Sequence, residues 1–446
     1  MNYPDSVHFL YALGNEIKTA KLGLGRIGTV LDALGRPQDR LRFVHVAGTN
    51  GKGSVCAMIE SALRADRRRT GLFTSPHLAE PTERIRIGGL PLSAERFAGA
   101  FDRVHAVVEK LLDSGAIDMH TTYFETVTAM ALWVFAEERV DVVVLEVGLG
   151  GRLDATNVVV PELSVITPVD FDHEAFLGKS LQSIAGEKAG ILKTAVPAVF
   201  ARQRPEAARV LEDRAAALAV PVVRTEDWSI RELALDPRGS RFVLVAPNRA
   251  GLGGWQAAPP PRVGQAVPPA QQYLRIHCPL AGEHQVENAV TAAVALARLG
   301  VPGAAIEAGI ARTEWPGRLE RVAESPEIIL DGAHNPAGAR ALAAYIERFY
   351  SGRPVRLIYG AMRDKAIEEI SGVLFPRAQQ VIVTAPRQAR ALSPEAIHRI
   401  SDHPNLLTAP DIEAALALVR GAAPEDVIFV TGSLFLVAEA RALLLG

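Results

Sequence analysis

Residues 45–63, HVAGTNGKGSVCAMIESAL, decide the fold of this chain. An apolar run is followed by three glycines and Lys52, and then by apolar residues with the spacing of a buried helix face. Glycines let the backbone turn tightly and bring its N–H groups close to an anion, and a helix N-terminus adds unpaired donors. The stretch therefore predicts a strand, a phosphate-binding loop and a helix. The apolar residues of the helix are Val55, Met58, Ile59, Ala62 and Leu63.

The loop departs from the standard phosphate-binding pattern, which has Ser or Thr directly after the lysine. Here Gly53 intervenes, and the hydroxyl comes from Ser54. The alternative is an ordinary glycine-rich turn between a strand and a helix. Because strand, loop and amphipathic helix occur together, we expect the loop to bind phosphate. Its residues are Gly48, Thr49, Asn50, Gly51, Lys52, Gly53 and Ser54.

The composition gives no sign of a polyanionic or membrane partner. The chain has 446 residues, which is too long for one ordinary core, so we expect two domains. A formal net charge of −2 creates no global field toward nucleic acid or anionic lipid. Two cysteines without paired zinc spacing favour a reducing compartment. No run approaches the ~20 apolar residues of a membrane span, and the N-terminus lacks a secretory pattern. We therefore expect a cytoplasmic protein that binds neither nucleic acid nor membrane.

Short apolar runs alternate with helical patterns along the chain, which indicates parallel sheets covered by helices. The runs of the N-terminal part are rich in valine and isoleucine, as in strands buried on both faces. Residues 283–299, rich in alanine and leucine, read as a long buried helix. The predicted strands are 42–47, 140–148, 163–169 and 196–200.

A second α/β pattern begins near residue 327 and predicts a compact, doubly wound domain. Its helix 336–350 places Leu342, Tyr345, Ile346 and Phe349 on one face. The predicted strands are 327–331, 355–360, 379–385 and 426–432, and further helices are expected near 364–373, from Ser393, from Asp411 and over 433–445.

Two stretches interrupt these patterns. A proline and a glycine within 311–321 suggest the hinge between the two domains. Residues 246–272 are packed with proline and glycine and show no period, so we expect an irregular insertion. A surface loop without a catalytic part is the simplest interpretation of this insertion.

Three residues offer ligands for the magnesium ion that accompanies a nucleoside triphosphate. Glu146 ends a buried apolar run, where an acid is costly unless it is paired or holds a metal. Ser75 lies in FTSPH, and His173 follows another predicted strand. Each has a plain alternative: Ser75 as a turn cap, Glu146 as the partner of an arginine, and His173 as one polar residue of an acidic loop. Their common position beside the phosphate loop favours a metal site.

Several further motifs occur in the order of a known family. They are FVHVAGTNGKGS, TSPHL, ERIRIGG, TYFETVTAMAL, VLEVGLGGRLDATN, DHEAFLG, IAGEKAGILK, GEHQVENA, WPGRLE and LDGAHNP. The chain resembles folylpolyglutamate synthases, including the bifunctional dihydrofolate synthase form, from about residue 20 to the C-terminus. The muramyl peptide ligases share the architecture and a GTNGK loop.

The resemblance implies a P-loop-type ATPase domain over 1–312 and a smaller Rossmann-like glutamate ligase domain over 313–446. It implies an ATP- and Mg²⁺-dependent ligase that adds L-glutamate to a folate, or to dihydropteroate, through an acyl phosphate. Members of the family are mostly monomers. The implied partners are the pteridine substrate, L-glutamate and ATP.

The resemblance also implies roles for individual residues. Lys188 matches a lysine that is carbamylated in the family and would assist a metal, together with Ser75, Glu146 and His173. Lys52, Lys188 and His173 are the expected catalytic residues. The residues matching ATP-contacting positions are Asn288, Arg318, Asp331 and His334. Their alternatives are structural: Asp331 and Asn335 as helix caps, and Arg318 as a surface arginine beside the hinge.

The folate end of the site is expected around GLGGRLDATN, with Asp154 as hydrogen-bonding residue and Arg152 in the same loop. The alternative is a structural turn that Asp154 caps. Phe124 is expected to pack and Glu125 to assist the site. Pro81-Thr82 departs from many members of the family, which leaves the substrate preference open.

The sequence leaves two other functions open, one of another ligase and one of a protein that is not an enzyme. A muramyl peptide ligase would need an additional N-terminal domain, whereas the phosphate loop here begins at residue 48. A nucleotide-binding regulator that has lost ligation would not need Lys52, Glu146, His173 and Lys188 together.

Overall fold

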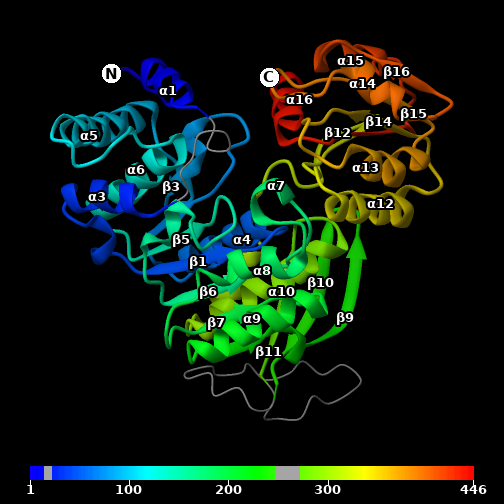
Figure 1. Cartoon of the computed structure of the whole chain (residues 1–446). Helices are drawn as coiled ribbons and strands as arrows, with labels where there is room; N and C mark the ends of the chain where they lie inside the picture. The colour runs from blue at the N-terminus through cyan, green and yellow to red at the C-terminus, as the bar shows by residue number, and fades with distance from the viewer. Residues whose placement is uncertain (15–22, 248–271) are drawn as a thin grey trace.

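The computed structural model describes residues 1–14, 23–247 and 272–446. Figure 1 shows an N-terminal part, coloured blue to green, and a C-terminal part, coloured gold to red, that meet along one side. Each part is built on a mainly parallel sheet with helices around it, so the predicted α/β class is confirmed. Among the described residues, no helix has both the length and the apolar character to cross a membrane.

The N-terminal sheet has eight strands in the order β4-β3-β2-β5-β1-β6-β7-β8. The six strands from β2 to β8 in this order are parallel, and β3 and β4 extend the sheet as an antiparallel hairpin. All four strands predicted here are present. The bounds are β1 Phe43–Ala47, β2 Thr70–Phe73, β3 Ile85–Ile87, β4 Leu90–Pro91, β5 Val142–Glu146, β6 Leu163–Ile166, β7 Ala198–Phe200 and β8 Val222–Arg224.

The register of the central strands brings three loops to one edge of the sheet. In β1, Val46 pairs with Glu146 of β5, and Ala47 pairs with Ile166 of β6. The chain therefore leaves β1, β5 and β6 at nearly the same height. Because carboxyl ends of parallel strands form the ligand edge of open α/β sheets, the glycine-rich loop, Glu146 and the segment after β6 become neighbours.

Helices cover both faces of this sheet, as Figure 1 shows. In β1, Val44 contributes to a core with α4, α10 and α11, whereas Phe43 contributes to a core with α3, α5 and α6. This alternation is the period of two expected of a strand buried on both sides. The bounds are α1 Tyr3–Ala12, α3 Gly25–Ala33, α4 Lys52–Ala65, α5 Ala94–Asp113, α6 Tyr123–Glu137, α7 Glu174–Leu177, α8 Leu181–Ala189, α9 Pro205–Ala217, α10 Glu283–Arg298 and α11 Gly303–Ile310.

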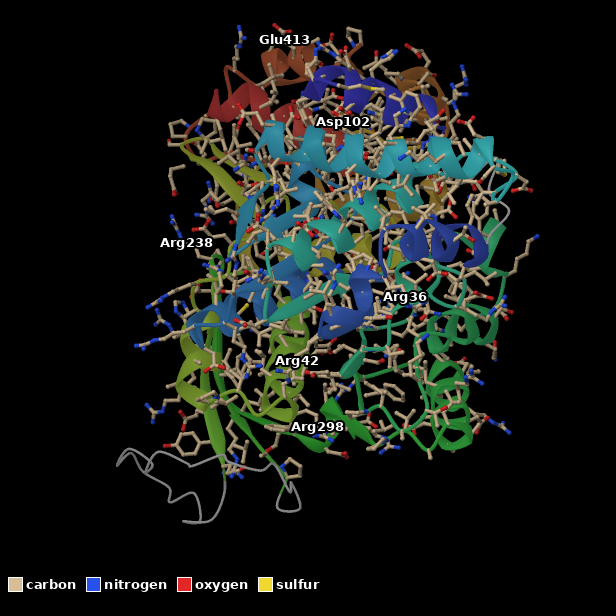
Figure 2. All side chains as sticks on the ribbon, turned by 90° about the vertical axis from the view of Figure 1, so that its left-hand side faces the viewer. Arg36, Arg42, Asp102, Arg238, Arg298 and Glu413 are labelled. Atoms are coloured by element: carbon tan, nitrogen blue, oxygen red, sulfur yellow. The ribbon has the colours of Figure 1, made fainter. Side chains whose placement is uncertain are left out.

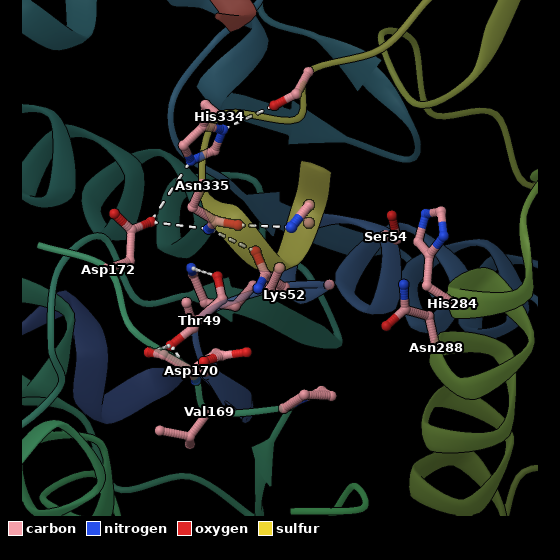
Figure 3. A pocket seen from close by; sticks show the side chains of 18 of the residues that line it. Thr49, Lys52, Ser54, Val169, Asp170, Asp172, His284, Asn288, His334 and Asn335 are labelled. Atoms are coloured by element: carbon pink, nitrogen blue, oxygen red, sulfur yellow. Dashed lines mark hydrogen bonds and ion pairs between the residues drawn. The ribbon is translucent and has the colours of Figure 1, made fainter. Parts of the chain in front are cut away.

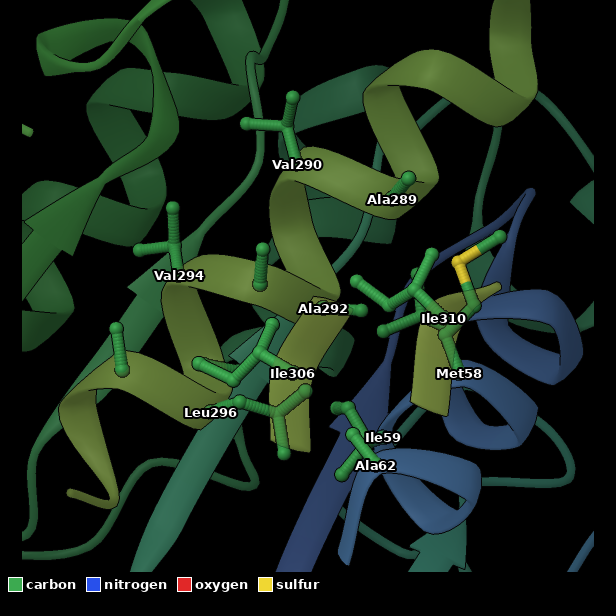
Figure 4. Close-up of a cluster of buried hydrophobic side chains, with 14 of the residues drawn as sticks. Met58, Ile59, Ala62, Ala289, Val290, Ala292, Val294, Leu296, Ile306 and Ile310 are labelled. Carbon is green, nitrogen blue, oxygen red and sulfur yellow. The ribbon is translucent and has the colours of Figure 1, made fainter. Parts of the chain in front are cut away.

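Helix α4, which begins directly in the phosphate loop, is buried on nearly every side. The predicted apolar face is confirmed, since Val55, Met58, Ile59, Ala62 and Leu63 are inaccessible to solvent. Figure 4 shows α4 (blue) packed against α10 and α11 (olive), with Met58, Ile59 and Ala62 facing Ala292, Ile306 and Ile310. This packing fixes the start of the helix relative to the sheet.

A small antiparallel sheet of order β11-β10-β9 was not predicted. Its strands are β9 Ser229–Asp236, β10 Gly239–Val245 and β11 Tyr273–Cys278. The proline- and glycine-rich stretch 246–272 connects β10 to β11, and residues 248–271 lie outside the described part of the chain.

The C-terminal sheet has the order β12-β13-β17-β14-β15-β16, with only β12 antiparallel. All predicted strands and helices are present, and Leu342, Tyr345 and Ile346 of α12 are buried as expected. The short strands β12 and β16 were missed. The bounds are β12 Glu320–Glu324, β13 Glu327–Leu330, β14 Val355–Tyr359, β15 Gln380–Val383, β16 Leu406–Thr408, β17 Val427–Thr431, α12 Pro336–Tyr350, α13 Ile367–Leu374, α14 Pro394–Arg399, α15 Ile412–Leu418 and α16 Leu434–Leu445.

The contact between α4 and α11 gives a test of the packing. A Cβ atom on Gly309 of α11 would lie 2.1 Å from the Cα atom of Ala62, so the two backbones touch. We expect Gly309→Ala to lower the free energy of unfolding by about 1–3 kcal/mol, because the helices must move apart. Denaturant unfolding followed by circular dichroism measures it.

Gly99→Ala in α5 is the matched control, since nothing lies within 4 Å of the added methyl group. It should stabilise the chain by about 0.5–1 kcal/mol through helix propensity. Equal effects of the two substitutions would contradict the close contact.

Candidate active site

A cleft of about 490 Å³ lies where the carboxyl edge of the N-terminal sheet meets the C-terminal part. Every residue predicted to hold nucleotide or metal lines it, and Figure 3 shows the cleft from close by. The structure therefore brings together residues that are separated by up to 286 positions between Gly48 and His334. The predicted residues that line the cleft are Gly48, Thr49, Asn50, Gly51, Lys52, Gly53, Ser54, Ser75, Glu146, His173, Lys188, Asn288, Arg318, Asp331 and His334.

The glycine-rich loop is shaped by two positions that require glycine. Gly51 caps α4 with a φ of 84°, and a Cβ atom there would lie 2.2 Å from the Oδ1 atom of Asn288. Gly48 has a φ of 149°, and a Cβ atom would lie 1.8 Å from the Oγ1 atom of Thr167. Among the described residues, no side chain caps the N-terminus of α4, whose first residues line the cleft, so its first N–H groups have no side-chain acceptor there. Such a terminus is suited to bind an anion.

The loop is held against the segment that follows β6. The backbone N–H of Thr49 donates to the carbonyl of Pro168 at 3.0 Å, and its hydroxyl donates to the carbonyl of Asp170 at 2.9 Å. The Nζ atom of Lys52 lies 3.2 Å from the carbonyl oxygen of Thr49, which it contacts as a donor. The side chain of Lys52 thus folds back so that its amine lies beside the glycine-rich loop.

Glu146 is a buried carboxylate whose charge its protein neighbours compensate only in part. Its Oε2 atom accepts a hydrogen bond of 3.0 Å from the backbone N–H of Ser75. Burial raises the pKa of Glu146, against the lowering effect of Lys52, Ser75 and Arg318. A carboxylate, a serine hydroxyl and the imidazole of His173 lining one cleft form a donor set that fits a hard divalent cation.

Lys188 enters the same cleft from α8 as a buried amine. Its Nζ atom donates to the carbonyl of Gly48 at 2.7 Å. Burial, with a further contribution from Lys52, lowers the pKa of Lys188 to about 7. A large fraction of this amine is therefore neutral near pH 7 and available as a nucleophile.

The C-terminal part supplies the opposite wall of the cleft. Asp331, after β13, accepts hydrogen bonds of 3.0 Å from the backbone N–H groups of Leu319 and Ala333, so it ties the predicted hinge to the C-terminal sheet. Asn335, not Asp331, is the N-cap of α12. Arg318 is half-buried rather than a fully exposed surface residue, and its partial burial lowers its pKa.

Sequence reasoning missed Asp172, which joins the two walls. Its carboxylate lies 2.7 Å from the Nζ atom of Lys365, 3.2 Å from the Nδ2 atom of Asn335 and 3.7 Å from the Nε2 atom of His334. Figure 3 shows Asp172, His334 and Asn335 turned toward one another. An acid directly before His173 was visible in the sequence, but these three partners come from loop segments of the C-terminal part.

Four predicted substrate residues do not line the cleft. Phe124 packs against Phe73, with 5.7 Å between ring centroids, and Glu125 caps α6 and pairs with Arg26 at 2.7 Å. Arg152 pairs with Glu187 at 2.9 Å on the surface.

The fourth residue is Asp154, whose carboxylate is engaged within its own loop. Its Oδ2 atom accepts from the N–H of Leu149 at 2.8 Å, and its Oδ1 atom accepts from the N–H of Thr156 at 3.0 Å. These contacts are those of the structural turn that was the alternative for Asp154.

A smaller pocket of about 120 Å³ adjoins the cleft and shares Ser75, Glu146 and Arg318 with it. Trp315 forms one wall, and the guanidinium of Arg86 lies 5.3 Å from the centroid of its ring. An aromatic face beside Glu146 can accept a flat ring next to the nucleotide cleft. Neither Trp315 nor Arg86 was predicted as a site residue.

Two known domain families match the chain. The Mur ligase middle domain matches residues 46–296, and the Mur ligase glutamate ligase domain matches residues 317–434. A Mycobacterium tuberculosis protein named dihydrofolate synthase/folylpolyglutamate synthase is 35% identical over 457 residues, which cover 94% of this chain and 89% of that protein. A Lacticaseibacillus casei folylpolyglutamate synthase is 35% identical over 459 residues, which cover 100% of this chain and 99% of that protein.

Solved structures give the same result for the fold. Mycobacterium tuberculosis folylpolyglutamate synthase complexed with ADP superimposes with a TM-score of 0.88 at 33% identity and covers 99% of each chain. Escherichia coli FolC in complex with DHPP and ADP has a TM-score of 0.83 at 30% identity and covers 98% of this chain and 97% of that one.

The lowered pKa of Lys188 predicts a pH-dependent stability. Between its folded pKa of about 7 and its ordinary value of 10.5, the unfolded chain binds a proton that the folded chain has released. The free energy of unfolding should therefore rise with pH in this window, by on the order of 1 kcal/mol per pH unit from this group. Relative to the parent, Lys188→Met should be most stabilising below pH 7 and progressively less so above it.

Urea unfolding with a chelator in carbon dioxide-free buffer measures this difference. The exposed Lys110→Met substitution controls for the loss of a lysine as such. A difference between Lys188→Met and the parent that stays constant with pH would show that the buried amine does not titrate in this window.

Proposed function

The chain belongs to the folylpolyglutamate synthase family of Mur ligases, and we propose that its cleft joins L-glutamate to a folate with ATP as the energy source. The enzyme is an ATP-dependent, amide-forming ligase. The single observation that carries the proposal is the meeting of Lys52, Arg318 and Glu146 with the bare N-terminus of α4 in one cleft between two sheets.

Ligation of this kind has one main physical demand. The carboxylate of the folate attacks the γ-phosphorus of ATP, the bond to the bridging oxygen breaks, and ADP leaves an acyl phosphate. The amine of glutamate then attacks the acyl carbon, phosphate departs, and the amine proton is lost. Because the first step brings two anions together, neutralisation of charge controls it.

The N-terminal wall of the cleft is arranged to meet this demand. We propose that the loop Gly48–Ser54 binds the β- and γ-phosphates through its N–H groups and that Lys52 neutralises their charge. Asn288 lies behind Gly51, where its Nδ2 atom donates to Gln285 at 2.9 Å, and keeps the loop in place. These groups would bind and orient the triphosphate, and none of them needs to act as a general base or to form a covalent bond.

The donor set at the cleft fits Mg²⁺, which neutralises the phosphate charge when bound. Ser75, Glu146 and His173 are the residues that would hold it. The support is the buried carboxylate of Glu146, whose raised pKa indicates that a further cation would favour its ionised form.

We propose that Lys188 reacts with carbon dioxide. Its neutral amine would form an N–C bond and lose a proton, which gives an anionic carbamate in the cleft that His173 also lines. The burial of this amine and its contact with Gly48 support the proposal, because only the unprotonated amine is nucleophilic. Lys52, Lys188 and His173 are thus the proposed catalytic residues.

The C-terminal wall is proposed to complete the nucleotide site. Arg318 and His334 would contact ATP, and Asp331 positions Arg318 through the backbone of Leu319. This division assigns residues 1–312 to the ATP-binding domain and residues 313–446 to the glutamate ligase domain.

The pocket at Trp315 is the best-supported place for the pteridine ring, since it opens onto Glu146 and the phosphate loop. The earlier candidates Phe124, Glu125, Arg152 and Asp154 remain predictions, and the contacts that they make here are those of structural residues. We further propose that the enzyme acts as a monomer in the cytoplasm, with small molecules as its only substrates.

The direct test is release of ADP from ATP by the purified chain with L-glutamate and either tetrahydrofolate or dihydropteroate. Stimulation by tetrahydrofolate is expected, and stimulation by dihydropteroate would add the dihydrofolate synthase reaction. Turnover that needs neither pteridine would contradict the folate assignment.

Lys52→Ala should lower kcat by about 100-fold or more, since the γ-phosphate loses its fixed cation. The exposed Lys110→Ala is the matched control.

Lys188→Ala should lower the rate at least about tenfold, because the carbamate ligand is lost. Acetate should restore part of the activity by supplying a carboxylate in the space of the side chain. Lys193→Ala is the matched control: this lysine is half-buried and donates to the Oδ1 atom of Asn157 at 2.8 Å, so acetate should not affect that variant. Full activity of Lys188→Ala without acetate would exclude the carbamate.

A further inference from the structure

A second group of metal-ligating side chains lies outside the cleft. His105 and Glu109 are one turn apart on α5, and His120 lies in the segment between α5 and α6. None of them lines the cleft. Figure 1 places α5 on the outer side of the N-terminal part, and α5 faces the viewer in Figure 2, where Asp102, three residues before His105, is labelled.

The three side chains converge on one point. The Nδ1 atom of His105 and the Nε2 atom of His120 each lie 3.8 Å from the Oε1 atom of Glu109. All three ligand atoms lie within 4.8 Å of one another. Tetrahedral zinc with bonds of about 2.0–2.1 Å separates its ligands by about 3.3 Å. The two contacts to Glu109 would shorten by about half an ångström, and the two imidazole nitrogens, within 4.8 Å of each other, would approach by at most about 1.5 Å.

The nitrogens that face this point have no other use in the described part of the chain. The Nδ1 atom of His105 and the Nε2 atom of His120 are buried and have no hydrogen-bond partner among the described residues. The other ring nitrogen of His120, Nδ1, lies 2.9 Å from the carbonyl oxygen of Thr121. A proton on Nδ1 satisfies that carbonyl and leaves the lone pair of Nε2 directed at Glu109, which is the arrangement of a metal-binding imidazole.

Aromatic packing fixes both rings before any ligand arrives. Phe9 of α1 contacts His105 and His120, with centroid separations of 4.7 Å and 5.6 Å. Phe101, one turn before His105, stacks on its ring at 5.3 Å. Glu109, in contrast, is half exposed and free to adjust. Two packed imidazoles and one half-exposed carboxylate form a site that can close on an ion through small side-chain shifts, without refolding.

We propose that His105, Glu109 and His120 bind a zinc-like transition metal ion that fastens the segment before α6 to α5. Two imidazole nitrogens and one carboxylate oxygen suit Zn²⁺ rather than Mg²⁺, which prefers oxygen ligands. Three protein ligands leave the fourth position to water. The ion would hold the segment that leads into the capping box of Thr122 and Glu125, at the start of α6.

The test is a titration of the tag-free, full-length protein with Co²⁺ alone and then with Zn²⁺, in excess Mg²⁺ and without nucleotide. The parent should show the visible absorption of a low-coordinate Co²⁺ site, lose it when Zn²⁺ displaces the cobalt, and melt at a higher temperature with Zn²⁺. Glu109→Gln and His120→Gln should weaken Co²⁺ binding at least about tenfold and remove the thermal shift.

The histidines of the nucleotide cleft remain in every variant, so any Co²⁺ absorption that they cause is the same in the parent and in the variants. The exposed His398→Gln on α14 is the matched control and should behave as the parent. Glu109→Gln changes an exposed carboxylate on the surface of α5, so its fold is not at risk. Equal Co²⁺ affinity in the parent, Glu109→Gln and His120→Gln, or a parent without the absorption band, would overturn the proposal.

Discussion

The contact of Asp172 with the C-terminal part is the interaction on which the geometry of the cleft depends. Asp172 lies in the segment after β6 of the first sheet, whereas Lys365, Asn335 and His334 lie in loop segments of the C-terminal part. Burial favours the neutral acid, but His334 and Lys365 together hold the pKa of Asp172 well below its usual range. The carboxylate therefore stays ionised and holds the N-terminal and C-terminal parts in a fixed position relative to each other. A nucleotide bound at Lys52 consequently meets both walls.

The same cleft concentrates charges that the fold leaves incompletely compensated. Glu146 is buried with a hydrogen bond from a backbone N–H, Arg318 is half-buried near it, and the amine of Lys188 donates to a backbone carbonyl. In a purely structural core such groups would be paired or replaced. In a ligase that brings a carboxylate to a triphosphate, they are preorganised for ligands that carry the missing charge.

The sequence was most informative where function and fold share a short stretch. The loop Gly48–Ser54 and the strand ends at Glu146 and Asp331 could be predicted, because carboxyl ends of parallel strands collect ligand residues at one edge. Asp172 could not be assigned, because its partner Lys365 is 193 residues away and no local pattern links them.

The motif residues on the folate side show the opposite limit of prediction. Glu125 and Asp154 lie in specific motifs, yet their carboxylates cap local backbone in this structure. A motif records that a residue type is required and does not say whether a ligand or the chain itself requires it. The strands β9, β12 and β16 escaped prediction for another reason: each lies at the edge of its sheet, and all three lack a clear apolar run.

The connection between the two domains has a mechanical consequence. The hydroxyl of Thr313 bonds to the carbonyl of Gly309 at 3.1 Å, so the chain is still anchored to α11 there, and Gly317 is already tied to the second sheet through Gly332 at 2.9 Å. Only 314–316 span the gap, and in their middle Trp315 lies so close to Gly53 that a methyl group would not fit between them. A rotation of the C-terminal part about this tripeptide would therefore move the indole of Trp315 against the phosphate loop.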